Sequence, residues 1–227
     1  MGSSGEYLNV DAVVVDIDDT IVNTDRRRHA AWCRVLGRKI PLQEVESHGS
    51  REILRRYAFS SRKIWEKFWM LTLCVEESGG DLLELDKPIP HASETLNRWN
   101  QQHKLVYLTG RTENMRQLTV DELRRFGFPT READLEMFAL KDWIRFFSST
   151  ASVLATRSKM FSSISEQYNI LRVIDDNPRF FAAYRKAPVP DRVGLLRKKR
   201  FSPREYLENG ATRVVESWEQ LREPWLT

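Results

Sequence analysis

The feature that most constrains this chain is a short apolar run that ends in a cluster of carboxylates. Residues 12–15 are all apolar, and four polar positions follow: Asp16, Asp18, Asp19 and Thr20. Consecutive apolar residues are typical of a strand buried on both faces, and acids at its carboxyl end lie where open α/β sheets bind ligands. Neighbouring carboxylates repel one another unless a divalent cation such as Mg²⁺ neutralises them. The run therefore predicts a buried strand that ends at a site for metal-assisted phosphate chemistry.

Three later stretches also place functional groups next to apolar strands or helices. Short, mainly apolar segments predict two further buried strands, and a helix-like segment precedes the second of them. An Asn-Pro pair then ends that strand and begins another helix. The functional groups are Thr109 and Gly110 after strand 105–108, Lys159 near the start of the helix, and Asp175 and Asp176 after strand 171–174.

Taken in order, these four stretches resemble the signature of the haloacid dehalogenase-like (HAD) hydrolase superfamily. That signature consists of an Asp-x-Asp-x-Thr strand end, a Ser or Thr strand end, a Lys and an acidic pair. The resemblance spans roughly residues 12–222 and implies an α/β fold, with a doubly wound, Rossmann-like parallel sheet and an inserted helical cap. It places the core at residues 6–22 and 88–227 and the cap at 23–87. Asp18 favours the phosphatase branch, because the dehalogenase branch lacks an acid there.

The resemblance also implies a role for each residue, in an Mg²⁺-dependent phosphatase that hydrolyses a phosphate monoester. Asp16 would attack phosphorus and form an aspartyl-phosphate. Asp18 would protonate the leaving oxygen and then deprotonate the hydrolytic water. Thr109 and the Gly110 N–H would bind a phosphoryl oxygen, and Lys159 would balance the negative charge. The Mg²⁺ ligands would be Asp16, the backbone carbonyl of Asp18, and Asp175, with Asp176 as a ligand or close neighbour.

Two parts of this assignment leave alternatives. Lys141 competes with Lys159, because it follows the strand-like residues 135–140. We prefer Lys159, which lies one helix before the Asp175 strand, where the family places its lysine. Lys141 or Arg111 would then contact the substrate. Many relatives carry Gly where this chain has Asp19, although the family includes members with Asp there.

The segment between the first two motifs is too long for a simple crossover, and its pattern is helical. One helix is expected from Thr24 or Asp25 to about Gly37, a second from Ser50, and a third from Ser60 or Ser61 that ends at 78–80. The third carries an aromatic stripe of Trp65, Phe68 and Trp69, interpreted as the cap's own core, with a dimer surface or a base-stacking platform as alternatives. In HAD proteins such an insertion covers the active site and selects the substrate. Arg51, between two cap helices, is our candidate for substrate contact.

Composition is typical of a globular enzyme. The chain has 227 residues, of which 41% are hydrophobic and 30% charged, and no apolar stretch is long enough to cross a membrane. Two cysteines, Cys33 and Cys74, are too few for a disulfide framework and fit a reducing cytoplasm. Cytoplasmic localisation without a membrane partner is therefore the expectation.

The charge balance attracts anions only mildly. A formal net charge of +4 does not by itself indicate nucleic-acid binding. The basic runs 26–28 and 197–200 are interpreted as solvated surface, with a phosphate-steering rim as the alternative for the first. Thr-Gly-Arg and Ile-Asp-Asp also resemble the 3′-phosphatase part of bacteriophage polynucleotide kinase/phosphatase, so nucleic-acid end processing is one alternative. The helical insertion favours a small phosphorylated substrate instead. A non-catalytic phospholigand-binding protein, a phosphotransferase and a phosphomutase are further alternatives.

Overall fold

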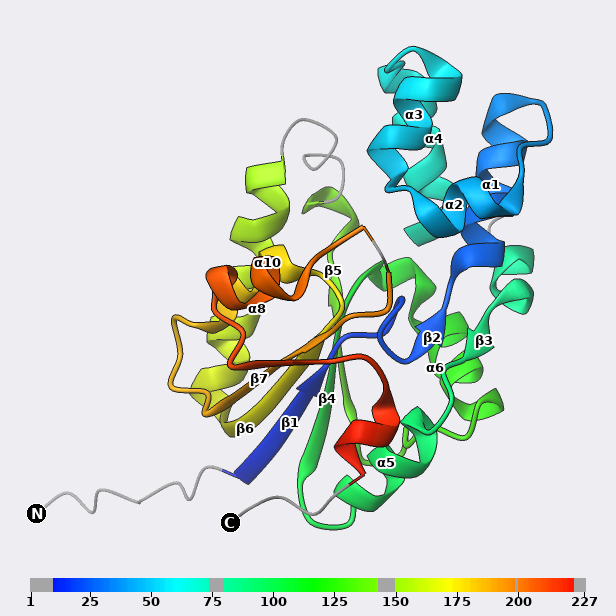
Figure 1. The fold of residues 1–227 in the computed structure, drawn as a ribbon. Coiled ribbons are helices and arrows are strands. Elements are labelled where there is room, and N and C mark those ends of the chain that lie inside the picture. Colours follow the sequence, from blue (N-terminus) through cyan, green and yellow to red (C-terminus); the bar gives the residue numbers. More distant parts are fainter. Residues whose placement is uncertain (1–9, 74–79, 143–149, 199, 223–227) are drawn as a thin grey trace, which may run out of the picture.

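The computed structural model describes residues 10–73, 80–142, 150–198 and 200–222 (Figure 1). Its centre is a six-stranded sheet in which neighbouring strands run parallel, in the order β5-β4-β1-β6-β7-β8. The strands are β1 (Val10–Val15), β4 (Lys104–Thr112), β5 (Asp134–Phe138), β6 (Tyr168–Asp175), β7 (Asp191–Leu195) and β8 (Arg213–Val215).

Helices cover both faces of this sheet. One face packs against α5 (Ala92–Trp99), α6 (Arg116–Arg125) and the 3₁₀ helix η4 (Trp218–Leu221), and the other against α8 (Thr150–Gln167), α9 (Phe181–Tyr184) and α10 (Pro203–Asn209). Successive side chains of a strand point to opposite faces, so β1 contributes Val13 and Val15 to one core and Ala12 and Val14 to the other. The predicted double burial of β1 and the doubly wound α/β architecture are confirmed.

The strand order places the carboxyl ends of β1 and β6 side by side. From β1 the chain continues to β4 and β5 on one side, and only then crosses to β6 on the other. The Asp16 N–H donates to the carbonyl of Ile174 at 3.0 Å, so the residues that follow the two strands are neighbours. Such a reversal of strand order leaves a crevice at the carboxyl edge of the sheet, where ligands of open α/β proteins bind.

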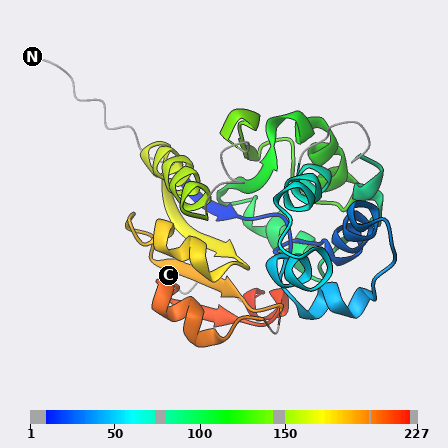
Figure 2. The ribbon, with the colours of Figure 1, turned by 90° about the horizontal axis from the view of Figure 1, so that it is seen from above.

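A helical cap lies beyond this edge (Figure 1). Its two connections to the core are the short antiparallel strands β2 (Val22–Asn23) and β3 (Lys87–Pro88), at the predicted cap ends 23 and 87. Seen from above, the cap leaves the helices α8 and α10 uncovered (Figure 2). Between β2 and β3 lie α1 (Asp25–Leu36), α2 (Leu42–Ser47), α3 (Ser50–Ala58), α4 (Arg62–Leu73) and the 3₁₀ helix η1 (Gly80–Leu85).

The expected cap helices correspond to α1, α3 and α4, whereas α2 was not expected. The C-cap Gly37 has φ 64°, a conformation that glycine adopts without strain, which is why α1 ends there. The expected end of the third helix at 78–80 falls partly outside the described residues. In the core, the predicted helix after Asn177 forms as η3 (Pro178–Phe180) and α9.

Two features of the core differ from the sequence-based expectation. Helix α10 was not predicted, although Ser202 and Glu205 form a capping box and so display the Ser-x-x-Glu signal of a helix start. The sequence also predicts a final helix that begins near Glu216, and this forms as the short 3₁₀ segment η4 rather than as an α-helix. Among the described helices, none has both the length and the apolar character needed to cross a membrane.

Candidate active site

Three carboxylates meet where β1 and β6 end. Asp16, Asp175 and Asp176 are buried, and one oxygen from each lies within 4.8 Å of the other two. Burial raises the pKa of Asp16 well above its usual value, and the charge of Asp175 raises it further. Burial also raises the pKa of Asp176 to about 7, with a further contribution from Asp19. A hard divalent cation would relieve this repulsion, so the predicted ligand side chains form a donor set that fits such an ion.

A buried arginine, not the predicted lysine, contacts these acids. Arg157 of α8 donates from Nη2 to Asp16 Oδ1 at 3.0 Å and to Asp175 Oδ2 at 2.7 Å. Lys159 is exposed, because two residues along a helix are separated by about 200° around its axis. Lys141 is exposed as well. The expectation that Lys159 faces the acids is therefore wrong, and Arg157 takes the position assigned to it.

Two aromatic residues hold Arg157 in place. The Tyr184 hydroxyl donates to Asp175 Oδ2 at 2.6 Å and accepts from Arg157 Nε at 2.8 Å. The ring centroid of Phe180 lies 4.7 Å from the guanidinium carbon. Arg157 Nη1 is buried without a hydrogen-bond partner in the described part of the chain. One donor of a fixed guanidinium thus stays available near Asp16. Only lysines were expected in this role, because the HAD signature has a lysine there. Arginine supplies the same charge with a planar set of donors.

Asp18 is held by two arginines. Arg27, from the cap helix α1, donates to its Oδ1, and Arg111, from β4, approaches the same oxygen with Nη2 at 2.8 Å. Burial alone would raise the pKa of Asp18, but Arg111 and Arg27 outweigh burial and hold this pKa below its usual value. The Asp18 carboxylate is therefore stabilised in its ionised form.

The end of β4 meets the expectations only in part. Arg111, a predicted substrate contact, is fully buried and does not line the cavity described below, because Asp18 and Glu122 occupy its guanidinium. Its contact with a substrate stays a prediction. Thr109 is also buried, and its hydroxyl accepts the Arg111 N–H at 3.2 Å. Gly110 lines the cavity, at an irregularity in the pairing of β4 with β5 that redirects these groups toward the sheet's carboxyl edge.

Asp19 is the centre of a separate ion-pair cluster. Its φ of 66° is a conformation that glycine adopts without strain, and Asp is among the residues that tolerate it. Its Oδ2 accepts from Lys198 Nζ at 2.6 Å and from Arg28 Nη1 at 3.0 Å. Burial would raise the pKa of Asp19, but Lys198 and Arg28 hold it far below its usual value.

The two basic runs are therefore not simply solvated surface. Arg27 and Arg28 of the first run, and Lys198 of the second, are buried and paired with acids. Their acidic partners follow β1, so the runs hold the Asp16–Asp19 segment rather than steer phosphate from outside. The long sequence separation of Lys198 from Asp19 explains why the sequence alone did not reveal this.

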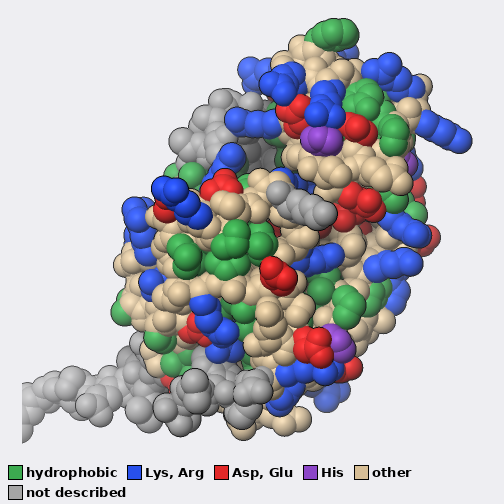
Figure 3. All heavy atoms as spheres, in the orientation of Figure 1, with side chains coloured by type: hydrophobic (Ala, Val, Ile, Leu, Met, Phe, Trp, Pro, Cys, Tyr) green, Lys and Arg blue, Asp and Glu red, His purple; other side chains and the backbone are tan. Residues whose placement is uncertain are grey.

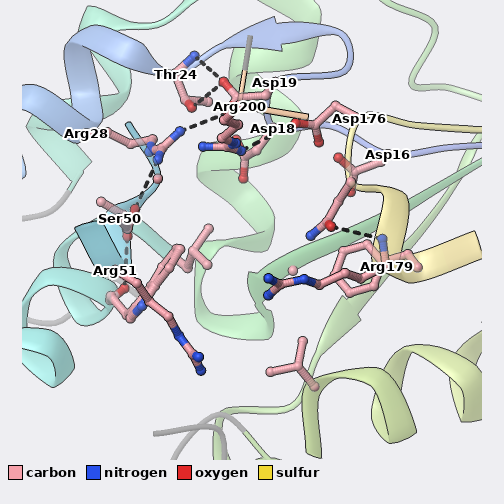
Figure 4. A pocket seen from close by; sticks show the side chains of 18 of the residues that line it. Asp16, Asp18, Asp19, Thr24, Arg28, Ser50, Arg51, Asp176, Arg179 and Arg200 are labelled. Carbon is pink, nitrogen blue, oxygen red and sulfur yellow. Dashed lines mark hydrogen bonds and ion pairs between the residues drawn. The ribbon is translucent and has the colours of Figure 1, made fainter. Parts of the chain in front are cut away.

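A cavity of about 620 Å³ separates the cap from the carboxylates. Its core side includes Asp16, Asp18 and Asp176. The cap contributes Arg51, the candidate for substrate contact, and part of the aromatic stripe of α4. Figure 4 shows Arg51 and Arg179 entering this space from opposite sides. A small molecule held here would have its reacting group beside Asp16 and its other end against the cap.

The aromatic stripe of α4 divides between two environments. Phe68 is fully buried in the cap core, where its ring stacks on Trp32 with a centroid distance of 4.0 Å. Trp65 and Trp69 are only half-buried and line the cavity. The prediction that the stripe forms the cap core is therefore confirmed for Phe68 and incomplete for the two tryptophans.

Comparison with known proteins finds similarity in fold. No model of a protein family matches the chain, and no curated protein is significantly similar to it in sequence. A HAD family hydrolase from Deinococcus radiodurans R1, solved with bound phosphate and sodium, has a TM-score of 0.62 and 19% identity, covering 94% of each chain. A HAD-superfamily hydrolase of subfamily IA from Geobacter sulfurreducens PCA has a TM-score of 0.59 and 16% identity, covering 93% of this chain and 94% of its own. A predicted phosphatase from Clostridium acetobutylicum has a TM-score of 0.62 and 14% identity, covering 94% of this chain and 97% of its own. The expected HAD-like fold is confirmed.

A buried excess of negative charge lies beside Asp18, where the cap joins the core. Asp86, between η1 and β3, has Arg27 Nε at 3.2 Å and Arg111 Nη2 at 3.6 Å, while Glu122 pairs with Arg111 at 2.6 Å. Two buried guanidinium groups thus face three carboxylates, Asp18, Asp86 and Glu122, and the partly exposed Arg125 lies 4.0 Å from Glu122. Burial raises the pKa of Asp86 to about 8 against the attraction of Arg27, so the folded protein retains a proton there near neutral pH.

Replacing this acid by its amide should change how stability depends on pH. Between about pH 4 and about pH 8 the folded wild type holds a proton on Asp86 that the unfolded chain has lost, so stability falls as pH rises through this window. Asp86→Asn removes that titration. Its free energy of unfolding should therefore rise relative to wild type across the window, by at most about 1.4 kcal/mol per pH unit. Urea unfolding of both proteins at several pH values measures this difference.

The matched control is Asp81→Asn, because Asp81 is an exposed acid of the adjacent η1 whose pKa lies below its usual value beside Arg34. This variant should differ from wild type by a constant amount over the same pH window. A constant difference for Asp86→Asn as well would contradict the buried proton.

Proposed function

We propose that this chain, which has the fold of the HAD hydrolases, is a phosphatase that hydrolyses a phosphate monoester through an aspartyl-phosphate. The observation that carries the proposal is the convergence of Asp16, Asp175 and Asp176 within 4.8 Å. Asp16 and Asp176 lie on the wall of a cavity, and Arg157 contacts Asp16 and Asp175. Burying several carboxylates together lowers the stability of the fold. Such a cluster is therefore typical of a functional site. The three acids are thus close enough to act on one bound phosphate group.

Asp16 is the proposed nucleophile. Its Oδ1 accepts from Arg157 and its Oδ2 from the Thr20 hydroxyl at 3.1 Å, so two donors fix the orientation of the carboxylate. Both donors stabilise the ionised form, which is the form that attacks phosphorus. The Asp16 oxygen would form a bond to phosphorus as the ester oxygen leaves, and water would then hydrolyse the aspartyl-phosphate.

The proposed metal is Mg²⁺, held by the carboxylates of Asp16, Asp175 and Asp176 and by the backbone carbonyl of Asp18. All three carboxylates offer hard oxygen ligands, and their mutual repulsion supports the need for a cation. When bound, Mg²⁺ would neutralise charge on the phosphoryl oxygens and on the nucleophile.

Arg157, Thr109 and Gly110 are proposed to position the phosphoryl group. Arg157 has a buried donor without a hydrogen-bond partner in the described part of the chain, which supports a contact with a phosphoryl oxygen. The Thr109 hydroxyl accepts the Arg111 N–H and keeps its own hydrogen for donation, while Gly110 lines the cavity with its backbone. Fixed donors of this kind stabilise the charge of the transition state without reorganisation.

Asp18 is proposed to act on the proton of the hydrolytic water. Arg27 and Arg111 stabilise its carboxylate, which is the form that accepts a proton. The same contacts disfavour the protonated form, so protonation of the leaving oxygen by Asp18 is the part of the sequence-based hypothesis with the least structural support.

A small substrate fits the site better than a polynucleotide. The reacting carboxylates lie between cap and core, and the cavity of about 620 Å³ suits a molecule of modest size. Lys and Arg side chains are dispersed over the face in Figure 3 rather than gathered in one strip that a nucleic-acid backbone could follow. Phosphate release from a 3′-phosphorylated oligonucleotide that declines steeply with salt would instead favour end processing.

Removing the nucleophile should abolish turnover. Asp16→Asn keeps the shape of the side chain but not its nucleophilicity, so phosphate release from 4-nitrophenyl phosphate should fall by at least about 10³-fold. Asp11→Asn is the control, because Asp11 is an exposed acid of the same strand. Retained turnover in Asp16→Asn would reject the covalent mechanism. If wild type binds phosphonates but turns over no ester of a broad panel, the non-catalytic alternative would replace the proposal.

Chelation of the metal should inhibit the enzyme reversibly. Excess EDTA should remove phosphate release, and added Mg²⁺ should restore it, because three clustered carboxylates require a cation to accommodate a phosphate dianion. EDTA that has been saturated with Mg²⁺ beforehand serves as the control. Full activity in metal-free buffer would contradict the assigned site.

Arg157 and Lys159 provide a matched pair on one helix. Arg157→Gln should lower kcat/KM by about 10²-fold, since it removes a charged donor beside the reacting group. Lys159→Gln should leave kcat/KM unchanged, because Lys159 is exposed. Steady-state kinetics on an aryl phosphate, with urea unfolding to verify folding, decide between them. The reverse result would restore the original assignment of the lysine.

A further inference from the structure

The wall of the cavity has a chemical order from its deep end to its opening. Asp16 and Asp176, at the deep end, are buried. Trp65 and Trp69, farther out, are half-buried. Arg51 and Arg179 also line the cavity but are exposed, so they lie at its opening. A bound molecule would therefore meet acids, then aromatic surface, then cations.

The aromatic zone comes from both sides of the cavity. Trp65 and Trp69 of α4 are nearly perpendicular, at 88°, with centroids 5.3 Å apart, and so present a face and an edge. Phe180, from η3 of the core, is half-buried and lines the same cavity. Aromatic side chains from cap and core thus line one cavity, and a planar ring bound there would gain from both apolar burial and ring geometry.

Arg179 is not among the cations that pair with the acids of the cavity wall. Those acids contact their own cations: Arg157 for Asp16, Arg27 and Arg111 for Asp18, and Arg28 and Lys198 for Asp19. Glu52, a cap acid that lines the cavity, is paired with Arg55 and Arg56. In the described part of the chain, no carboxylate forms an ion pair with Arg179. Arg179 therefore presents positive charge at the opening that an anionic ligand group would complete, and Arg51 reaches into the cavity from the cap side (Figure 4).

From this order we propose that the substrate is an elongated phosphate monoester whose leaving group is an aromatic ring with a second anionic group at its far end. The proposal rests on the proposed phosphatase function and names the substrate class of the same site. The phosphoryl group binds beside Asp16, the ring lies between the α4 tryptophans and Phe180, and the second anion lies between Arg51 and Arg179. Figure 4 shows these two side chains reaching into the cavity from cap and core.

The first test compares 4-carboxyphenyl phosphate with 4-carbamoylphenyl phosphate, which has the same shape but no second charge. Wild type should prefer the carboxylate in kcat/KM by about tenfold or more, the usual effect of a charge-assisted hydrogen bond. Arg51→Gln and Arg179→Gln should each reduce this preference. Arg62→Gln should keep it, because Arg62 is an exposed cap arginine that pairs with Glu66. A ratio of two substrates does not depend on the fraction of enzyme that is folded.

The second test addresses the ring. Trp69→Leu should lower kcat/KM for 4-carboxyphenyl phosphate more than for 3-phosphoglycerate, which carries a carboxylate but no ring. Phe59→Leu is the control, because Phe59 is exposed at the end of α3 and lies outside the cavity. Equal losses on both substrates would overturn the aromatic part of the proposal.

Binding to wild type separates this proposal from the phosphatase assignment. Calorimetric titration with (4-carboxybenzyl)phosphonate and with benzylphosphonate should give tighter binding of the former by about tenfold. Hydrolysis without any preference for the carboxylate would overturn this proposal and leave the phosphatase assignment intact. Selective binding without hydrolysis of any ester would overturn the phosphatase assignment and leave the selection of the second anion intact.

Discussion

The structure around the proposed site depends on how buried acids are neutralised. Asp16, Asp18 and Asp19 follow one strand, and each is held by different cations, drawn from α8, from the cap and β4, and from the loop that carries Lys198. Because an unpaired buried charge is costly, these pairings fix the course of the chain after β1 as firmly as apolar packing does. Asp175 and Asp176 add charge that Arg157 and Arg200 balance only in part, which is the electrostatic reason to expect a divalent cation there.

The sequence predicted the structure correctly where a general rule relates a residue's position in the sequence to its location in the fold. The apolar run 12–15 indicated a strand buried on both faces, and parallel strands end at one edge, so Asp16 and Asp175 could be expected to converge. The predictions failed where helix phase was not considered or where the outcome depends on distant pairing. Arg157 lies four residues before Phe161 and seven before Ile164, so helical spacing places it rather than Lys159 on the face that packs against the sheet. Nothing local shows that Lys198 reaches Asp19. Arg111 follows a motif residue directly but is turned inward by Glu122, a partner that lies on another element.

The cap combines two kinds of recognition surface on neighbouring helices. Helix α4 buries Phe68 in the cap core while its adjacent tryptophans face the cavity, and α3 places Arg51 at the opening. One aromatic stripe in the sequence thus contributes both to the cap core and to the cavity wall. Helical periodicity does not distinguish these two environments, so it predicted a core position for all three side chains. The core thus supplies the acids of the cavity wall, whereas these cap side chains supply its aromatic surface and one of its cations.

The two cations that hold Asp18 belong to different parts of the chain. Arg27 belongs to the cap and Arg111 to the core, and the cap joins the core through the narrow β2–β3 ladder. A swing of the cap about that ladder, wide enough to admit a ligand, would withdraw one guanidinium from Asp18 and leave the other in place. Filling the pocket and setting the charge around Asp18 would then be coupled, and a molecule too large to let the cap close would leave Asp18 paired with Arg111 alone.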